Sequence, residues 1–345
     1  MRLPWSLFML VVPLLAQTPA RTGMKLGDFN VHDPWILAHQ ESKTYYLYTS
    51  GTVAGRSGGN RSGVVAYKSK DLENWDGPQQ IWVVPDGLWA NPAHGAWAPE
   101  VHRYRGRYYL FVTLHNNDKL LAPPALAYRV IYGATGQQNE PAQHHMRGTQ
   151  IFVGDSPEGP FQPMGNRPVA PVDYMTLDGT LYVENGVPWM VYAHEWIQVI
   201  DGTMEAIQLK PDLSEAVGEP FHMFKASDAP WLLDNQKVSK RPRSYVTDGP
   251  ELYRTKTGHL IMLWSSYRDG LYVETMAYST TGKLRGPWKQ AEPLVGNDSG
   301  HGMLFNTFEG KLMLILHQPF RQAKGKLFEM EDTGDAVRVL RQIVF

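Results

Sequence analysis

Short runs of alternating apolar and polar residues follow one another along almost the whole chain, and they constrain its fold more than any other feature. The runs are rich in β-branched and aromatic residues and span residues 44–50, 64–69, 108–114, 150–154, 181–184, 187–194, 205–209, 260–267, 271–279 and 311–317. Glycine (32 residues) and proline (25 residues) interrupt them at short intervals, and no long amphipathic helix pattern appears. The sequence therefore predicts an all-β fold rich in hairpins.

A weak repeat makes the predicted fold more specific. A turn followed by an aromatic residue comes after a strand at Lys70–Trp75, Asp155–Phe161, Asp228–Trp231 and Gly282–Trp288. Recurrence at roughly 50 to 80 residues is too long for one hairpin and suits a four-stranded unit. The chain has room for five such units, so we expect a five-bladed β-propeller with four-stranded antiparallel blades.

The first twenty residues have the pattern of a secretory signal peptide. Met1 and Arg2 precede an apolar stretch from Leu7 to Ala16, and small or polar residues follow as far as Ala20. We expect a signal peptide at residues 1–20, cut after Ala16 or Ala20, and a propeller domain at residues 24–345. The mature protein would be secreted or periplasmic.

The composition excludes several classes of partner and site. The chain has no cysteine, so disulfides, thiolate metal sites and thiol nucleophiles are ruled out. A net charge of -1 gives no electrostatic reason to expect nucleic acid or an anionic membrane. Aromatic residues make up 12% of the chain, with 11 Trp and 17 Tyr, which suits stacking against sugar rings. We therefore expect a monomer with a neutral carbohydrate as its partner.

Three acidic segments far apart in the sequence each place one carboxylate beside a proline or glycine bend at the start of a strand. They lie at residues 32–35, 177–181 and 247–251, and they carry Asp33, Asp178 and Asp248. Cleavage of a glycosidic bond needs one carboxyl group to protonate the leaving oxygen and another to activate water. If separate blades bring these side chains to one point, the site would suit glycoside hydrolysis.

The order of five motifs carries a resemblance to a known family. The motifs are Asp33-Pro34, Trp97-Ala98-Pro99-Glu100, Asp178, Asp248-Gly249-Pro250 and Gly300-His301-Gly302. This order resembles glycoside hydrolase family 43, whose five-bladed propellers act on arabinosides and xylosides. The resemblance implies inverting cleavage of α-L-arabinofuranoside, β-D-xyloside or galactan-type linkages. It also implies Asp33 as the general base and Asp178 as the residue that tunes the acid and positions the sugar.

The general acid is where this chain departs from the family pattern. The family's acid motif carries Glu, and Asp248 stands there with a side chain about 1.5 Å shorter. We consider Asp248 first, then Glu195, Glu100 and last Glu251. Whichever residue serves must stay protonated near neutral pH, and an inverting enzyme separates acid from base by roughly 6.5 to 9.5 Å.

Further residues are candidates for contacts with the sugar or with an ion. The expected substrate-binding residues are Trp97, Glu100, His194, Trp196, Trp264, Arg268 and His301. No cofactor is required, but the resemblance allows calcium or sodium near the propeller axis, held at His301 largely through water. The polar, proline-rich stretch from His115 to Gly148 shows little strand character, and we expect it to rim the site and to favour exo action.

Two alternatives to this hydrolase remain open. The missing Glu would also suit a catalytically inactive propeller that binds plant polysaccharide. A retaining fructan hydrolase or transferase uses a related five-bladed fold, but its acid lies in a Glu-Cys motif, which a chain without cysteine cannot contain.

Overall fold

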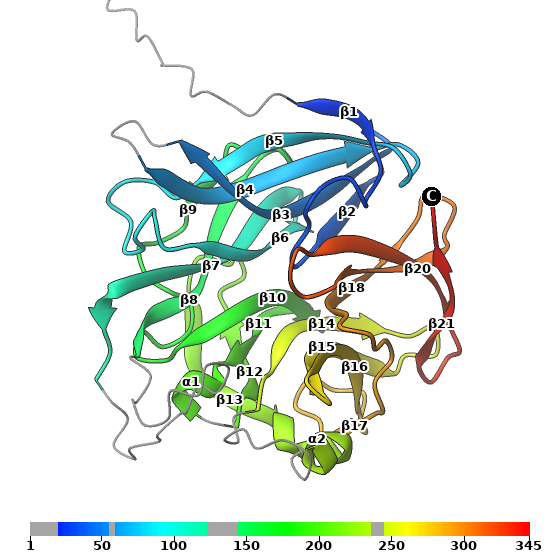
Figure 1. Cartoon of the computed structure of the whole chain (residues 1–345). Helices are drawn as coiled ribbons and strands as arrows, with labels where there is room; N and C mark the ends of the chain where they lie inside the picture. The colour runs from blue at the N-terminus through cyan, green and yellow to red at the C-terminus, as the bar shows by residue number, and fades with distance from the viewer. Residues whose placement is uncertain (1–19, 55–58, 123–143, 200, 236–244) are drawn as a thin grey trace, which may run out of the picture.

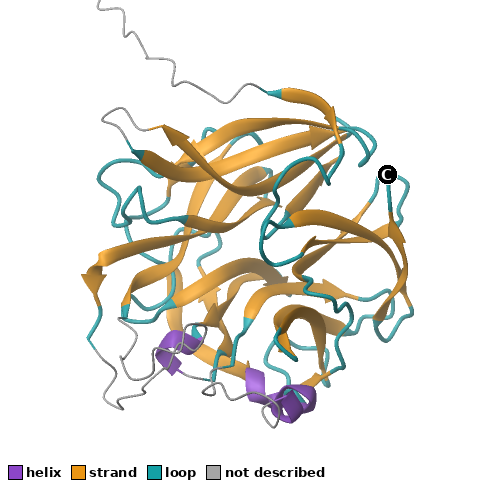
Figure 2. Cartoon of the chain, viewed as in Figure 1, coloured by secondary structure: helices purple, strands orange, loops and turns teal. Residues whose placement is uncertain are grey.

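A computed structural model describes residues 20–54, 59–122, 144–199, 201–235 and 245–345, and these residues lie mainly in β-strands (Figure 2). The helices of this part of the chain are short: α1 (Trp196–Val199), the 3-10 turn η1 (Ala226–Asp228) and α2 (Pro230–Asn235). The predicted signal peptide lies almost entirely in residues 1–19, outside the described residues, and stays a prediction.

Five antiparallel sheets follow one another along the chain and surround a common centre (Figure 1). The first contains β2 (Trp35–His39), β3 (Thr44–Ala54), β4 (Asn60–Ser69), β5 (Trp75–Val83) and an added outer strand, β1 (Arg21–Met24). The second contains β6 (Ala96–Tyr104), β7 (Arg107–Leu120), β8 (His145–Gly154) and β9 (Gln162–Pro163). The third contains β10 (Thr176–Glu184), β11 (Val187–His194), β12 (Thr203–Leu209) and β13 (Ala216–Lys225). The fourth contains β14 (Asp248–Arg254), β15 (Leu260–Arg268), β16 (Leu271–Ser279) and β17 (Trp288–Gln290). The fifth contains β18 (Gly300–Asn306), β19 (Leu312–Gln318), β20 (Lys324–Asp332) and β21 (Val337–Ile343). The predicted five-bladed propeller is confirmed.

Both faces of each blade are buried, so central strands such as β7 carry apolar residues on both sides. In β7, Tyr108 and Leu110 pack against the first blade, whereas Tyr109 and Phe111 pack against the third. Side chains alternate between the two faces of a strand, so one strand contributes to two cores. Each of the five hydrophobic clusters lies between two neighbouring blades, so stability is spread around the ring.

The prediction of little strand character between His115 and Gly148 is wrong at both ends of that stretch. Strand β7 continues to Leu120, and β8 begins at His145 and pairs with it. These ends of the two strands are mostly polar, so they lack the apolar pattern by which a strand is recognised. Pairing between β7 and β8 still satisfies their backbone hydrogen-bonding groups. Residues 123–143 lie outside the described residues.

The N-terminal segment joins the last blade to the first. Leu26, Phe29 and Val31 are buried in the cluster between these blades. The Val31 amide donates to the Ala323 carbonyl at 2.9 Å, and Leu26 packs over Gly325 of β20, where a Cβ would come within 3.2 Å of Leu26 Cδ2. Since the strands of the first and last blades belong to separate sheets, this packing helps close the ring.

One backbone feature recurs near the axis in all five blades. A residue with positive φ stands at the start of each innermost strand: Asp33 (48°), Ala98 (42°), Asp178 (56°), Gly249 (53°) and His301 (52°). The pairing register shifts at the same place in β6, β10, β14 and β18. Left-handed residues and bulges re-aim side chains and end regular pairing, so this bend turns the first residues of each innermost strand toward one end of the axis.

We expect Leu26→Ala to lower the free energy of unfolding by about 2–5 kcal/mol, because it leaves a cavity between the first and last blades. Chemical denaturation of the purified protein measures this change. Leu340→Ala on β21, where the side chain is 50% exposed, is the matched control and should change stability by less than about 0.5 kcal/mol. Equal effects of the two substitutions would contradict a closing role for Leu26.

We expect Gly249→Ala to destabilise the protein by about 1–3 kcal/mol, since alanine is strained at this φ of +53°. The added Cβ would also lie 2.9 Å from His301 Cγ. Gly218 has a similar φ of +73° but open space around it, so Gly218→Ala measures the backbone strain alone. Thermal unfolding should show a larger loss for Gly249→Ala than for Gly218→Ala.

Candidate active site

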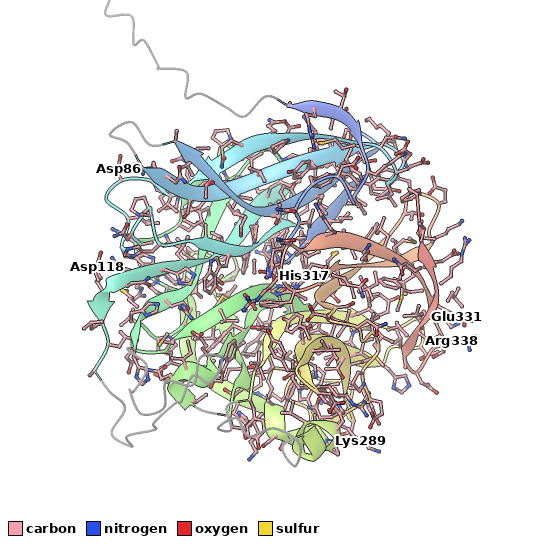
Figure 3. The ribbon with its side chains drawn as sticks, viewed as in Figure 1. Asp86, Asp118, Lys289, His317, Glu331 and Arg338 are labelled. Carbon is pink, nitrogen blue, oxygen red and sulfur yellow. The ribbon has the colours of Figure 1, made fainter. Side chains whose placement is uncertain are left out.

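A cavity of about 480 Å³ lies at the end of the propeller axis where the innermost strands begin. Its lining comes from all five blades and comprises His32, Asp33, Ser50, Trp97, Arg147, Leu177, Asp178, Glu195, Trp196, Ile197, Asp248, Tyr267, Tyr272, His301 and Phe320. His317 lies next to this lining. Figure 3 shows His317 at the centre of the molecule, whereas Glu331 and Arg338 lie at its periphery. The structure therefore brings Asp33, Asp178, Asp248 and Glu195 to one cavity.

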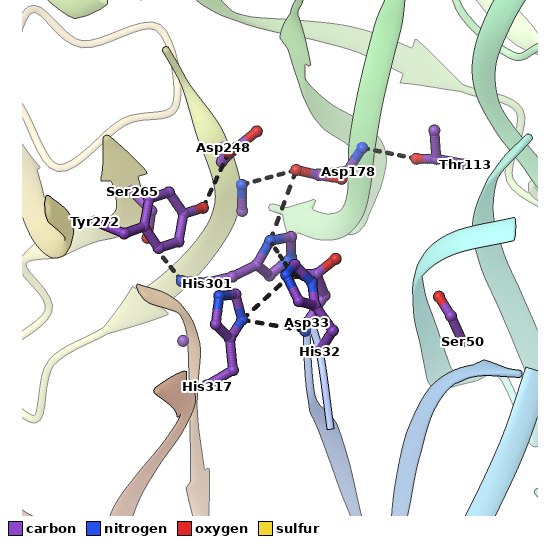
Figure 4. Close-up of polar contacts among 12 residues, drawn as sticks. His32, Asp33, Ser50, Thr113, Asp178, Asp248, Ser265, Tyr272, His301 and His317 are labelled. Carbon is purple, nitrogen blue, oxygen red and sulfur yellow. Dashed lines mark hydrogen bonds and ion pairs between the residues drawn. The ribbon is translucent and has the colours of Figure 1, made fainter. Parts of the chain in front are cut away.

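Asp33 precedes β2, and three histidines from two blades surround its carboxylate (Figure 4). The distances from Asp33 Oδ1 to the Nδ1 atoms are 2.8 Å for His32, 3.1 Å for His301 and 3.4 Å for His317. Burial alone would raise the pKa of Asp33, but His301 and His32 hold it well below its ordinary value. The carboxyl group is therefore ionised, as a general base must be.

Asp178 lies in β10 beside Asp33, and its pKa is shifted in the opposite direction. Its Oδ2 accepts a hydrogen bond from the Gly249 amide at 3.0 Å and lies 3.8 Å from His301 Nδ1. Its own amide donates to Thr113 Oγ1 at 2.8 Å, which fixes the bend of β10. Burial, followed by the charge of Asp33, raises the pKa of Asp178 well above its usual value.

Asp248 is the first residue of β14 and lies near Asp178 (Figure 4). The Tyr272 hydroxyl donates to Asp248 Oδ2 at 3.0 Å. Burial and then the nearby charge of Asp178 raise the pKa of Asp248 well above its ordinary value. This carboxyl group is thus able to carry a proton near neutral pH.

Glu195 also faces the cavity, but an arginine neutralises it. Arg147 Nη1 forms a buried ion pair with Glu195 Oε2, and Arg147 Nε donates to His115 Nδ1 at 3.0 Å. The Arg147 guanidinium also lies over the Trp97 ring at 5.0 Å. Burial raises the pKa of Glu195, whereas Arg147 opposes this shift. The ion pair favours an ionised Glu195.

Glu100 and Glu251 lie elsewhere, beside a second and much smaller cavity on the axis. This space of about 10 Å³ is also lined by Asp33 and His301, and it has room for about one water molecule. His102 Nε2 lies 2.8 Å from Glu100 Oε2, while Glu251 Oε2 is buried without a partner among the described residues. Burial raises the pKa of each of these two glutamates to about 8.

The small cavity fits the ion that the family resemblance implies. His301 Nδ1 is directed at Asp33 and Asp178, which leaves Nε2 as its free ligand atom. The unpartnered oxygen of Glu251 and the neighbouring Glu100 are hard oxygen ligands of the kind that calcium and sodium prefer.

Four of the predicted substrate-binding residues do not face the large cavity. Trp264 is fully buried between the third and fourth blades, because its ring fills the core and donates to Gln290. His194 is buried and bonded to Glu205 and Gln198, and Arg268 lies on the surface paired with Glu292. Glu100 faces only the small cavity.

Trp97 and Trp196 do line the large cavity, and Trp97 is 42% exposed, as a stacking surface must be. Sequence reasoning missed a further set of lining residues: His32, Arg147, Tyr267, Tyr272 and Phe320. Only His32 carried a signal, since it precedes Asp33 in the first acidic motif. The other four come from middle strands or loops whose direction depends on tertiary packing.

Comparisons with known proteins agree with this geometry. The family model described as "Glycosyl hydrolases family 43" matches residues 27–334. An endo-arabinase structure from Bacteroides thetaiotaomicron VPI-5482 is 34% identical, with a TM-score of 0.72, and the match covers 90% of this chain and 98% of that one. An endo-1,4-beta-xylanase structure from the same organism is 19% identical, with a TM-score of 0.64 and coverage of 92% and 98%, and shares the fold.

A curated relative adds a partial match. The extracellular endo-alpha-(1->5)-L-arabinanase 1 of Bacillus subtilis (strain 168) is 22% identical over 185 residues, which are 52% of this chain and 48% of the relative. The match thus spans about half of that protein. The family resemblance seen in the motifs is confirmed, because the family model covers most of the chain. The chain is a glycosidase that belongs to glycosyl hydrolases family 43.

Proposed function

We propose that this protein is an inverting glycosidase that cleaves α-L-arabinofuranosyl linkages of arabinan-type polysaccharides. The observation that carries the mechanism is the contrast between an ionised Asp33 and a proton-bearing Asp248 in one cavity. The arabinan substrate is supported by the names of the 34% identical endo-arabinase and the Bacillus subtilis arabinanase. Xylan and galactan are the competing substrates.

The proposed reaction is a single displacement. Asp33 takes a proton from a water molecule while the oxygen of that water attacks the anomeric carbon. The bond from this carbon to the leaving oxygen breaks at the same time, and that oxygen receives a proton from Asp248. The products are one sugar with an inverted anomeric centre and the released leaving sugar. Asp33 is then protonated and Asp248 ionised, and proton exchange with solvent restores both groups.

Asp248 is favoured as the acid over Glu195 because of their partners. The Asp248 carboxyl group is paired only with a neutral hydroxyl and lies near Asp178, so it is held as the acid. Glu195 faces the positive charge of Arg147, which stabilises its ionised form. Asp178 would then raise the pKa of the acid and position the sugar.

An ion, export, the oligomeric state and the mode of cleavage belong to the same proposal. A calcium or sodium ion held by His301, Glu100 and Glu251 would supply positive charge below the carboxylates. Export is supported by the N-terminal pattern and by the name of the extracellular relative. In the described part of the chain no helix has the length and apolarity needed to cross a membrane. We also propose that the protein is a monomer. In place of the exo action expected from the sequence, we propose that it cleaves within the polymer chain, since both arabinanase relatives are named endo enzymes.

We expect Asp33→Asn to lower kcat on linear arabinan by about 10²–10⁴-fold, because the amide cannot accept the proton of the attacking water. Reducing-end release from arabinan, xylan and galactan measures the activity, and proton NMR of the first product reports the anomer. Asp86→Asn changes an exposed residue far from the cavity and is the control (Figure 3). Binding of arabinan without any hydrolysis by the unmodified protein would instead support the inactive carbohydrate-binding propeller.

We expect Asp248→Asn to reduce cleavage of arabinan far more than cleavage of a nitrophenyl arabinoside, whose leaving group needs little protonation. Because Asp248 acts in its protonated form, activity should fall as pH rises through its elevated pKa. Glu195→Gln is the matched comparison. If Glu195→Gln shows the leaving-group dependence and Asp248→Asn does not, Glu195 is the acid.

A further inference from the structure

All the ionic contacts of Asp33 with histidines meet at one of its two oxygens. His32, His301 and His317 each direct Nδ1 at Oδ1, at 2.8, 3.1 and 3.4 Å. None of these three contacts is made to Oδ2. The two oxygens of this carboxylate are therefore in very different surroundings (Figure 4).

The three histidines do not play the same part. His317 Nδ1 accepts a hydrogen bond from the Asp33 amide at 3.2 Å, so this ring holds the backbone of Asp33 and not its carboxylate. His32 Nδ1 contacts Asp33 Oδ1 at 2.8 Å. Burial lowers the pKa of His32, but the neighbouring Asp33 carboxylate outweighs it and raises the pKa to about 9, so the ring is an imidazolium that can donate from Nδ1.

The His32 ring is also fixed in place by packing. It stacks on His317 with a centroid distance of 4.1 Å and meets the edge of Phe320 at 5.1 Å. Rotation of the ring would break the contact with Asp33 and this stack together. His32 therefore presents its Nδ1 proton to Asp33 in one defined direction.

We propose that His32 is a positioning residue for the base: with His301 it clamps Oδ1 of Asp33, so that Oδ2 is the oxygen that takes the proton from the attacking water. This inference rests on the proposed function, because it assumes Asp33 as the base. The clamp matters because the acceptor must be aligned with a water molecule within hydrogen-bond distance. A misplacement of about 1 Å can cost about 10²-fold in rate.

The same side chains have the composition of a metal site, since ligand atoms of His32, Asp33 and His317 lie within 4.8 Å of one another. The hydrogen bonds argue against that use. The Nδ1 lone pair of His317 already receives the Asp33 amide, and both nitrogens of His32 carry protons. Positioning therefore explains this cluster better than metal binding does.

The test compares His32→Ala with His32→Asn in kcat and KM on linear arabinan. Alanine removes the donor, and we expect kcat to fall about 10–100-fold with KM changed less than about twofold. The amide nitrogen of asparagine stands at about the place of Nδ1, because both atoms are bonded to Cγ. His32→Asn should therefore recover at least about tenfold of the loss without restoring a titrating group.

Controls separate the ways in which the idea can fail. Thermal unfolding of both variants shows whether they fold. His259 is an exposed residue between β14 and β15, outside the lining of the cavity, and His259→Ala should match the unmodified protein in kcat. An unchanged kcat in His32→Ala, a higher KM alone, or a folded His32→Asn as inactive as His32→Ala would each overturn the positioning role. An unmodified protein that does not hydrolyse arabinan, xylan or galactan, or an active Asp33→Asn, would instead overturn the proposed function.

Discussion

The active site depends on a left-handed bend that every blade makes at the start of its innermost strand. Asp33, Ala98, Asp178, Gly249 and His301 occupy equivalent places in the five blades. A non-glycine residue at positive φ costs about 1–3 kcal/mol, and such a conformation persists only where its surroundings fix it. Here the fixing contacts are hydrogen bonds between blades, such as those from the Asp178 amide to Thr113 and from the Gly249 amide to Asp178.

The bend also explains how the chain separates two kinds of carboxyl group. Residues at the bend or just before it, such as Asp33, Asp178 and Asp248, face the large cavity. Residues two or three positions further along, such as Glu100 and Glu251, face the small space on the axis. Five acidic side chains can therefore lie near one axis, because they are divided between two cavities that share Asp33 and His301.

The charges around the large cavity are balanced unevenly, and this imbalance supports the roles proposed for Asp33 and Asp248. Imidazole groups surround Asp33 and keep it ionised, whereas Asp178 and Asp248 lie close to that negative charge in a buried setting and favour their neutral forms. In the proposed mechanism Asp248 is the general acid, and its side chain is one methylene group shorter than that of the Glu in the family's motif. The Tyr272 hydroxyl defines the direction of the shorter side chain at this position.

The sequence alone predicted the fold class, the number of blades and a shared site for Asp33, Asp178 and Asp248, because strand patterns, turn spacing and motif order can be read along the chain. It could not tell that Trp264 fills a core while Trp97 stays exposed, since both are tryptophans in strands. Nor could it show that Arg147 pairs with Glu195 or that His32 and His301 share one oxygen of Asp33. The Arg147–Glu195 and His301–Asp33 contacts join residues 48 and 268 positions apart, and only the tertiary fold brings such side chains within hydrogen-bond distance.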